Sequence, residues 1–193
     1  MRSTGETRLD SLLREIEDIL VETIPRSIER LEVKEKVYCL FIRYYDTSVG
    51  EDYTPYVSVA PDRLRQSYVT RRGADAKHFI WSPQDLESDK PMPGELCEGH
   101  ELAKKCNESY RLMCAANRSG LPMVDESELL MPFRGAMHRV AARLNGQDWT
   151  GILDTTDDFI VLPTDEIGYW TASDMRASIP AERLEFFRSL GLI

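Results

Sequence analysis

Acidic side chains are concentrated in one late stretch of the chain, from Leu144 to Met175, which contains no lysine or arginine. Carboxylates at this density can bind a hard cation, supply an acid and a base for hydrolysis, or attract a basic protein. The glycine and the spaced ligands of an EF-hand loop are missing, so the sequence predicts no calcium site here. A solvated acidic surface is the simplest interpretation. The acidic residues are Asp148, Asp154, Asp157, Asp158, Asp165, Glu166 and Asp174.

Large aromatic residues lie among these carboxylates, and this combination favours protein recognition. Tight interfaces use aromatic anchors, and an acidic field speeds the encounter with a basic partner. We therefore predict that the stretch forms a binding surface for a basic protein. The predicted partner-binding residues are Asp154, Asp157, Asp158, Asp165, Glu166, Trp149, Tyr169 and Trp170.

Cysteine and histidine residues invite a zinc hypothesis, because Cys97 is followed by His100 and then by Cys106 and Cys114. The spacing departs from the paired short spacings of structural zinc sites. In a helix, Cys106 and Cys114 would lie more than about 10 Å apart along the axis. The sequence therefore predicts buried or loop thiols, with no metal ion, no cofactor and no disulfide.

No motif for a nucleophile, a phosphate or a catalytic metal is present in the sequence. His138 lies beside the apolar stripe of an expected helix, where a structural role is the usual one. We therefore expect a protein that is not an enzyme. The alternative hypothesis is a hydrolase of unknown substrate that uses Asp157 or Asp158 as acid or base.

The strand-like elements are rich in β-branched and aromatic residues. They are expected at 37–45, 56–60 and 159–162, and the first two are joined as a β-hairpin by a polar, glycine-containing loop. A further short strand is expected at 78–81, and the proline- and glycine-rich segment 82–99 is expected to be a loop with at most one helical turn.

Helical periodicity covers most of the remaining chain. It predicts a first helix that Pro25 breaks or kinks, a helix after Pro61, and helices at 100–117, 126–144 and 180–190. The inward positions after Pro61 are Leu64, Tyr68 and Val69, and those of the last helix are Leu184, Phe187 and Leu190. The arginines after Pro61, which are Arg63, Arg65, Arg71 and Arg72, are expected on a solvated face.

This order of elements does not alternate as in a doubly wound fold. It predicts a single α+β domain over residues 1–193, with a mostly antiparallel sheet of three to five strands and helices packed on one side.

Composition limits the kinds of partner. The chain is 42% hydrophobic and 30% charged, which is typical of a soluble globular protein, and its net charge is −9. Nucleic acid and anionic membranes would repel such a chain, so we expect neither as a partner. Residues 1–10 are polar and lack the apolar core of a signal peptide, so we expect a cytoplasmic protein with reduced thiols. The sequence does not indicate an oligomeric state.

Three phrases carry a resemblance: V-Y-C-L-F-I-R-Y-Y-D after the first helix, then W-T-G-I-L-D-T-T-D-D-F-I-V-L, and a terminal helix that ends in R-S-L-G-L. The pattern resembles a family of uncharacterised bacterial α+β domains, some of which act as immunity proteins beside secreted toxins. The resemblance covers most of the chain and carries no catalytic motif. It implies a single bacterial cytoplasmic domain that binds a protein.

Overall fold

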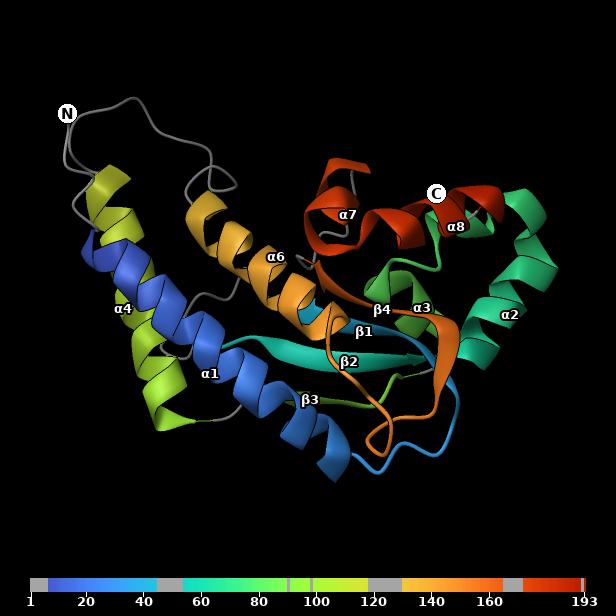
Figure 1. Cartoon of the computed structure of the whole chain (residues 1–193), viewed down its shortest axis with the longest axis horizontal. Helices are drawn as coiled ribbons and strands as arrows, with labels where there is room; N and C mark the ends of the chain where they lie inside the picture. The colour runs from blue at the N-terminus through green and yellow to red at the C-terminus, as the bar shows by residue number, and fades with distance from the viewer. Residues whose placement is uncertain are drawn as a thin grey trace.

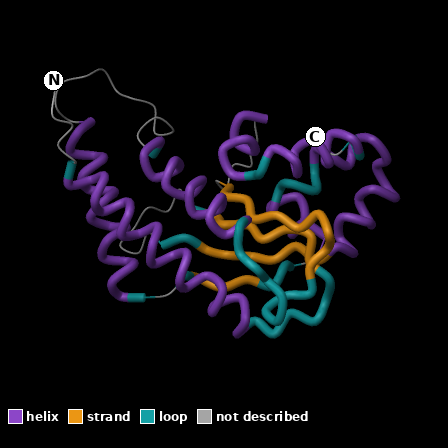
Figure 2. The backbone as a smooth tube through the Cα atoms, in the orientation of Figure 1, coloured by secondary structure: helices purple, strands orange, loops and turns teal. Residues whose placement is uncertain are grey.

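A computed structural model describes residues 7–44, 54–89, 91–97, 99–117, 130–164, 172–191 and 193. Four strands form one sheet with the order β3-β2-β1-β4, and helices surround it (Figures 1 and 2). The elements are α1 (Arg8–Arg30), β1 (Val37–Arg43), β2 (Tyr56–Pro61), α2 (Asp62–Arg72), the 3-10 helix η1 (Gly73–His78), α3 (Pro83–Asp89), β3 (Gly94–Leu96), α4 (His100–Asn117), α6 (Met131–Asn145), β4 (Thr155–Thr164), α7 (Ala172–Ser178) and α8 (Ala181–Ser189).

β1 is the central strand, as its composition suggests. It pairs antiparallel with β2 and parallel with β4, while β2 pairs antiparallel with β3. The predicted α+β class and the three predicted strands are confirmed, with β4 longer than expected at both ends. Tyr45, at the end of the first predicted strand, lies outside the described residues, as does the loop of the predicted hairpin.

Helices cover both faces of the sheet, which corrects the prediction that they pack on one side. Leu40 and Ile42 of β1 join a core cluster with α1, α4 and α6. Cys39 and Phe41 join a second cluster with α2, α3, α7 and α8. In Figure 1, α1, α4 and α6 lie towards the left of the view, and α2, α3 and α8 lie towards the right. The apolar run of β1 has no polar alternation because both of its faces are buried.

α1 continues through Pro25, so the two predicted alternatives at this proline are narrowed: the break is wrong, and the kink stays a prediction. The helix is a single element of 23 residues, and its N-cap Thr7 forms a capping box with Asp10. Ile24 and Ile28, on either side of the proline, are fully buried. The apolar stripe therefore extends past Pro25, and the burial of these side chains offsets the loss of one helical hydrogen bond.

The segment after β2 differs most from the prediction. α2 begins after Pro61 as expected, with Leu64 and Tyr68 buried, but Val69 is 42% exposed. Residues 78–81 form the end of η1 and a turn rather than a strand. Their apolar side chains are nevertheless needed in the core, where Ile80 and Trp81 join the second cluster.

The predicted loop 82–99 contains two short elements, α3 and β3. β3 has only three residues, and strand composition is not recognisable at that length. Gly94 is required at its first position. A Cβ atom there would lie 2.3 Å from the hydroxyl oxygen of Tyr56, whose ring covers the glycine from β2. The Arg43 guanidinium lies over the same Tyr56 ring, 5.6 Å from its centre, and is paired with Glu87.

The later helices follow their apolar periodicity. α4 occupies the predicted range. α6 ends at Asn145, one residue after the predicted end, and the predicted start of that helix at 126–129 lies outside the described residues. α8 buries Leu184 and Phe187, but the third predicted core residue, Leu190, is 52% exposed because it follows the last helical turn. α7 was not expected. In the described residues, no helix combines the length and the apolar character needed to cross a membrane.

Side chains bond the backbone of β4 on the side away from β1. The Asn145 amide donates to the carbonyl oxygen of Val161 at 2.9 Å, and its own oxygen accepts from the Val161 N–H at 2.8 Å. The Arg183 guanidinium donates to the carbonyl oxygens of Asp157 and Phe159 at 2.7 and 3.0 Å. These bonds anchor the C-terminal end of α6 and the first turn of α8 against β4.

Candidate functional site

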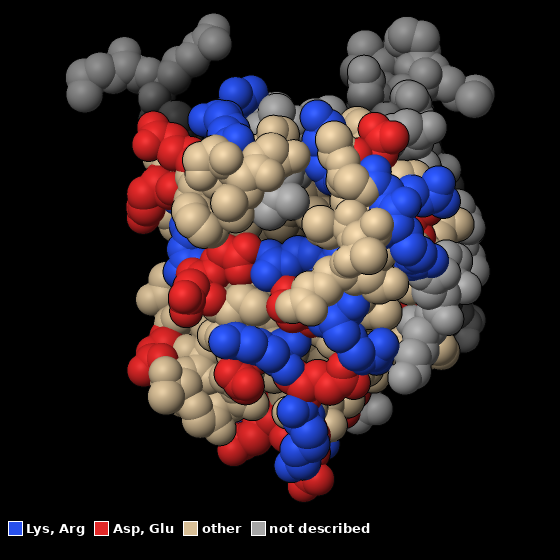
Figure 3. Space-filling view, turned by 90° about the vertical axis from the view of Figure 1, so that its right-hand side faces the viewer, with Lys and Arg blue, Asp and Glu red and all other residues tan. Residues whose placement is uncertain are grey.

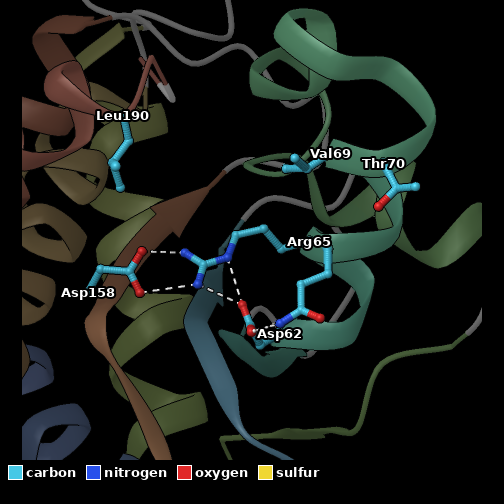
Figure 4. Close-up of a pocket in the computed structure, with 7 residues that line it drawn as sticks. Asp62, Arg65, Val69, Thr70, Asp158 and Leu190 are labelled. Carbon is cyan, nitrogen blue, oxygen red and sulfur yellow. Dashed lines mark hydrogen bonds and ion pairs between the residues drawn. The ribbon is translucent and has the colours of Figure 1, made fainter.

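An open pocket of about 390 Å³ lies between α2 and the end of α8 (Figure 4). Charged side chains occupy one side of it, and Val69, Thr70 and Leu190 lie across from them. The charged side comes from α2 and from the first residues of β4. The lining residues are Asp62, Arg65, Gln66, Val69, Thr70, Asp158 and Leu190.

Arg65 is held between two aspartates, and we call Asp62, Arg65 and Asp158 the charged trio. The guanidinium donates from Nη1 to Oδ2 of Asp158 and from Nη2 to its Oδ1, the latter at 3.2 Å. On the other side, Nε donates to Oδ1 of Asp62 at 2.7 Å, and Nη2 lies 2.6 Å from the same atom. Gln66 donates from Nε2 to Oδ2 of Asp62 at 2.5 Å. One guanidinium therefore serves two carboxylates.

The local fold explains this arrangement. Residues three and four apart share one face of a helix, so Asp62, Arg65 and Gln66 meet on α2. β4 supplies Asp158 through an irregularity in its pairing with β1: Val37 is paired with Thr155, but Cys39 is already paired with Ile160. The extra residues on β4 form a bulge, and bulges redirect side chains.

Burial and charge act together on the trio. The side chains of Arg65, Asp62 and Asp158 are 14%, 13% and 10% exposed. Burial alone would raise the pKa of Asp158, but the hydrogen bonds and the charge of Arg65 outweigh it, and the pKa is lowered. Burial alone would likewise lower the pKa of Arg65, whereas Asp158 and Asp62 raise it. Both groups are charged at neutral pH, and with two carboxylates and one guanidinium the trio carries one net negative charge.

Exposed apolar side chains lie across the pocket from the trio, beside the polar Thr70. Four large hydrophobic side chains are exposed in the described residues, namely Val69, Met131, Phe186 and Leu190. Two of them, Val69 and Leu190, line the pocket. Phe186 lies one turn before Leu190 on the same side of the α8 terminus, and the Leu190 N–H donates to its carbonyl oxygen. An exposed apolar patch beside charge is typical of interaction sites.

The four predicted partner-binding residues that lie in the described part of the chain differ in exposure. Asp154 and Asp157 are exposed, as expected for such a role. Asp158 is only 8% exposed because it is paired with Arg65. Asp165, Glu166, Tyr169 and Trp170 lie outside the described residues.

Trp149 is a core residue and cannot serve as an exposed anchor. It is 6% exposed, its ring packs edge-on against Phe159 with centroids 5.7 Å apart, and Nε1 donates to the carbonyl oxygen of Leu144 at 3.0 Å. A tryptophan next to polar residues in sequence looked like a surface anchor. It is buried because the turn after α6 folds back onto the sheet.

The carboxylates of Asp157 and Asp158 do not converge. Asp157 is exposed to solvent, whereas Asp158 is buried against Arg65. A general acid and base must both reach the reacting group, and Asp158 is held by a guanidinium that favours its ionised form. The geometry therefore gives no support to the alternative of a hydrolase that uses this pair.

The cysteines are unpaired thiols, and Cys39, Cys97 and Cys106 are buried. Burial raises the pKa of Cys97 to about 12, and Glu95 adds to the effect. Burial also raises the pKa values of Cys39 and Cys106. Over the described residues, no group of three or more His, Cys, Asp and Glu side chains is placed to hold a metal ion.

His138 is buried, as the sequence suggested, and its Nδ1 lies 2.6 Å from Oγ of Ser178. This contact joins α6 to the end of α7. Ser178 is only 2% exposed, and Asn145 donates to its carbonyl oxygen at 2.8 Å. The pair lies within the packing between helices, where it links two elements.

Sequence reasoning missed the pocket because its members are far apart in the chain. Arg65 was assigned to a solvated face, although it lies 4.7 Å from the centre of the buried Tyr38 ring and pairs with a residue of the last strand. One signal was available: the spacing of Asp62, Arg65 and Gln66 on a helix indicates a local ion pair. Nothing in the sequence indicated that Asp158 would complete it.

No protein-family model, curated protein or solved structure matches this chain. The resemblance to uncharacterised bacterial domains therefore stays a prediction.

Proposed function

We propose that this protein is a non-enzymatic binding domain that engages a basic partner protein through carboxylates at the beginning of β4. The observation that carries the proposal is the exposure of Asp148, Asp154 and Asp157 within a stretch that has no positive residue. An immunity or regulatory role in the bacterial cytoplasm agrees with such binding and belongs to the same proposal.

The exposure of these carboxylates and the net charge of the chain support the proposed binding of a basic protein. Exposed carboxylates keep their hydration and contribute little to folding, so they remain available to attract a partner. The net charge of −9 adds a long-range field that favours basic proteins over nucleic acid. Figure 3 shows that the face bearing α2 and α8 is of mixed charge, with basic and acidic side chains interleaved among uncharged ones. Selectivity on that face would therefore depend on local geometry rather than on the field alone.

The proposal is tested by capturing partners from the source organism and then measuring association with the purified partner. The test variant is Asp154→Asn with Asp157→Asn. The matched control is Asp18→Asn with Glu22→Gln, which removes the same charge from carboxylates of α1 that are 72% and 66% exposed. We expect association to slow by about tenfold for the test variant, to slow less for the control, and to weaken with added salt. Equal effects of the two variants, or a partner without a basic surface, would contradict the proposal.

A further inference from the structure

We infer that the pocket between α2 and α8 receives an arginine side chain of the partner, with apolar residues beside that arginine packing on the rim. This inference rests on the proposed function and extends it to a second, adjacent contact. The pocket is a built site rather than a patch of charge, because its charged trio is fixed by hydrogen bonds and its rim is apolar.

The charge of the trio selects a cation. Arg65 makes three hydrogen bonds to Asp62 and Asp158, and its Nη2 lies 2.6 Å from Asp62 as well, so little of its donor capacity is left for a ligand. Two carboxylates have about eight lone-pair positions, more than Arg65, Gln66 and the Thr156 and backbone donors to Asp158 fill. An incoming cation would be attracted by the net negative charge of the trio, whereas an anion would meet two carboxylates and little remaining donor capacity on Arg65.

The shape of the group favours arginine over lysine. A guanidinium can donate two parallel N–H groups to the oxygens of one carboxylate at the edge of the trio, whereas an ammonium group binds as a point charge. A guanidinium is also less strongly hydrated than an ammonium group, so it enters the pocket at a lower desolvation cost.

The apolar rim of the pocket would contact the parts of the ligand beyond the guanidinium group. Val69 is 42% exposed and Leu190 is 52% exposed, and both line the pocket opposite the trio. They would cover the methylene stem of the arginine, as amphipathic side chains require. Phe186, 45% exposed one turn earlier on α8, extends the apolar surface to the residues beside it. The occupant that fits is therefore a segment in which arginine is flanked by apolar residues.

The test uses the full chain labelled with ¹⁵N and the peptide acetyl-Leu-Arg-Leu-amide, with acetyl-Leu-citrulline-Leu-amide as the neutral match. We expect saturable NMR shifts confined to the Arg65 Nε–H, the Gln66 side-chain amide and the Thr70 and Leu190 backbone amides. Citrulline keeps the shape but removes the charge, so we expect its affinity to be at least about tenfold lower. Equal shifts with the two peptides, or no saturable shift at these groups, would overturn the inference.

Variants of the apolar rim residues test whether the peptide binds in the pocket or is only attracted by the charge of the protein. Val69→Ser and Leu190→Ser should each lower the affinity for the arginine peptide by about threefold or more. Met131→Ser, which removes another exposed side chain (54%) on α6, should leave binding unchanged. These residues are exposed, so the variants should keep the fold, and unchanged amide spectra would verify this. An equal loss with Met131→Ser, or no loss with either rim variant, would count against the pocket.

The outcomes distinguish this inference from the proposed function. Asp154→Asn with Asp157→Asn should slow association with the whole partner yet leave peptide binding in the pocket largely intact. If the peptide fails to bind while partner association keeps its dependence on these carboxylates, the pocket inference is wrong and the proposed function stands. If the peptide binds but the carboxylate variants associate normally, the proposed surface is wrong.

Discussion

Arg65 joins α2 to β4 through its ion pairs with Asp62 and Asp158, so the packing of these two elements depends on its guanidinium group. The side chains of its two carboxylate partners are each less than 15% exposed, so water cannot fully hydrate either of them if the arginine is removed. Removing one member of a buried pair leaves an uncompensated charge, which is far costlier than the pair itself is worth.

We therefore expect Arg65→Met to lower the free energy of unfolding by about 3 kcal/mol, the lower end of the range for a buried pair, because the open pocket admits solvent. The measurement is chemical denaturation at neutral pH. The matched control is Arg63→Met on the same helix, whose partner Glu35 is 46% exposed. The control should lose no more than about 1 kcal/mol. Similar losses for the two variants would show that the trio is merely a surface network.

The same trio predicts a dependence on pH. The pKa of Asp158 is lowered from its usual value near 3.8 in the folded state, so its contribution to stability is complete above that value. The contribution is lost as pH falls below about 4 towards the folded pKa, because protonation then favours the unfolded chain. The difference in unfolding free energy between wild type and Asp158→Asn should be constant from pH 5 to 7 and shrink at lower pH. A difference that does not change with pH would contradict the linkage.

Individual residue roles could be predicted only where a local rule decides them. Pro61 as the residue before a helix and His138 as a buried residue follow from local sequence, and both are confirmed. Trp149 and Asp158 were assigned to the surface because their neighbours in sequence are polar. Both are buried through contacts with residues distant in the chain, and no local rule reports such contacts.

At the scale of elements, the contact between β2 and β3 depends on the absence of a side chain at Gly94. A methyl group there would collide with the Tyr56 ring, with the nearest ring carbons at 2.6 and 2.7 Å. We expect Gly94→Ala to lower the free energy of unfolding by about 1–3 kcal/mol, the usual effect of overpacking, as measured by thermal unfolding. In the double variant with Tyr56→Ala, the added cost of the alanine should largely disappear. Additive effects of the two changes would show that the collision is relieved elsewhere.

α1 offers a prediction of opposite sign. Pro25 lies in a continuous helix and cannot donate to the carbonyl oxygen four residues earlier. Pro25→Ala should restore that bond and raise the unfolding free energy by about 1–3 kcal/mol, less the entropy that proline removes from the unfolded chain. Pro25→Gly is the control, since it restores the donor but has about 1 kcal/mol poorer helix propensity than alanine. Destabilisation by Pro25→Ala would mean that the proline ring itself packs usefully.

The elements recovered from sequence are those with long, regular patterns. α4 and the strands β1, β2 and β4 follow from periodicity and composition, because many residues contribute to each signal. β3, α3 and η1 are short, and their formation is decided by what they pack against. Residues 78–81 looked like a strand for a physical reason: a turn that must bury Ile80 and Trp81 has the same composition as a strand.

For the whole molecule, the sheet and its class followed from the sequence but the layers did not. A continuous apolar run such as that of β1 indicates burial on both faces, and this clue in the sequence was not used. With helices on both sides, the chain builds two core clusters that share one sheet. The order of the strands, with β4 beside β1 in parallel, depends on a long connection through several helices and could not be read from composition.

The bonds that Asn145 and Arg183 make to β4 have a consequence for how the protein behaves at high concentration. β4 is the last strand of the sheet, and its outer side would otherwise be a template on which a strand of another molecule could pair. Asn145 imitates such a strand, since it both donates to Val161 and accepts from it.

Asn145→Ala should therefore do two things at once. It should lower the unfolding free energy by about 1–3 kcal/mol, because buried backbone groups lose their partners. It should also make the protein self-associate through β4, seen as concentration-dependent light scattering and a rise in cross-strand infrared absorption. Asn145→Asp, which keeps an acceptor for the Val161 N–H but no donor, should be intermediate. If Asn145→Ala lost stability yet stayed monomeric, the outer side of β4 would be shielded by more than these side chains. On this account, the asparagine that ends α6 also closes the outer edge of the sheet in the described part of the chain.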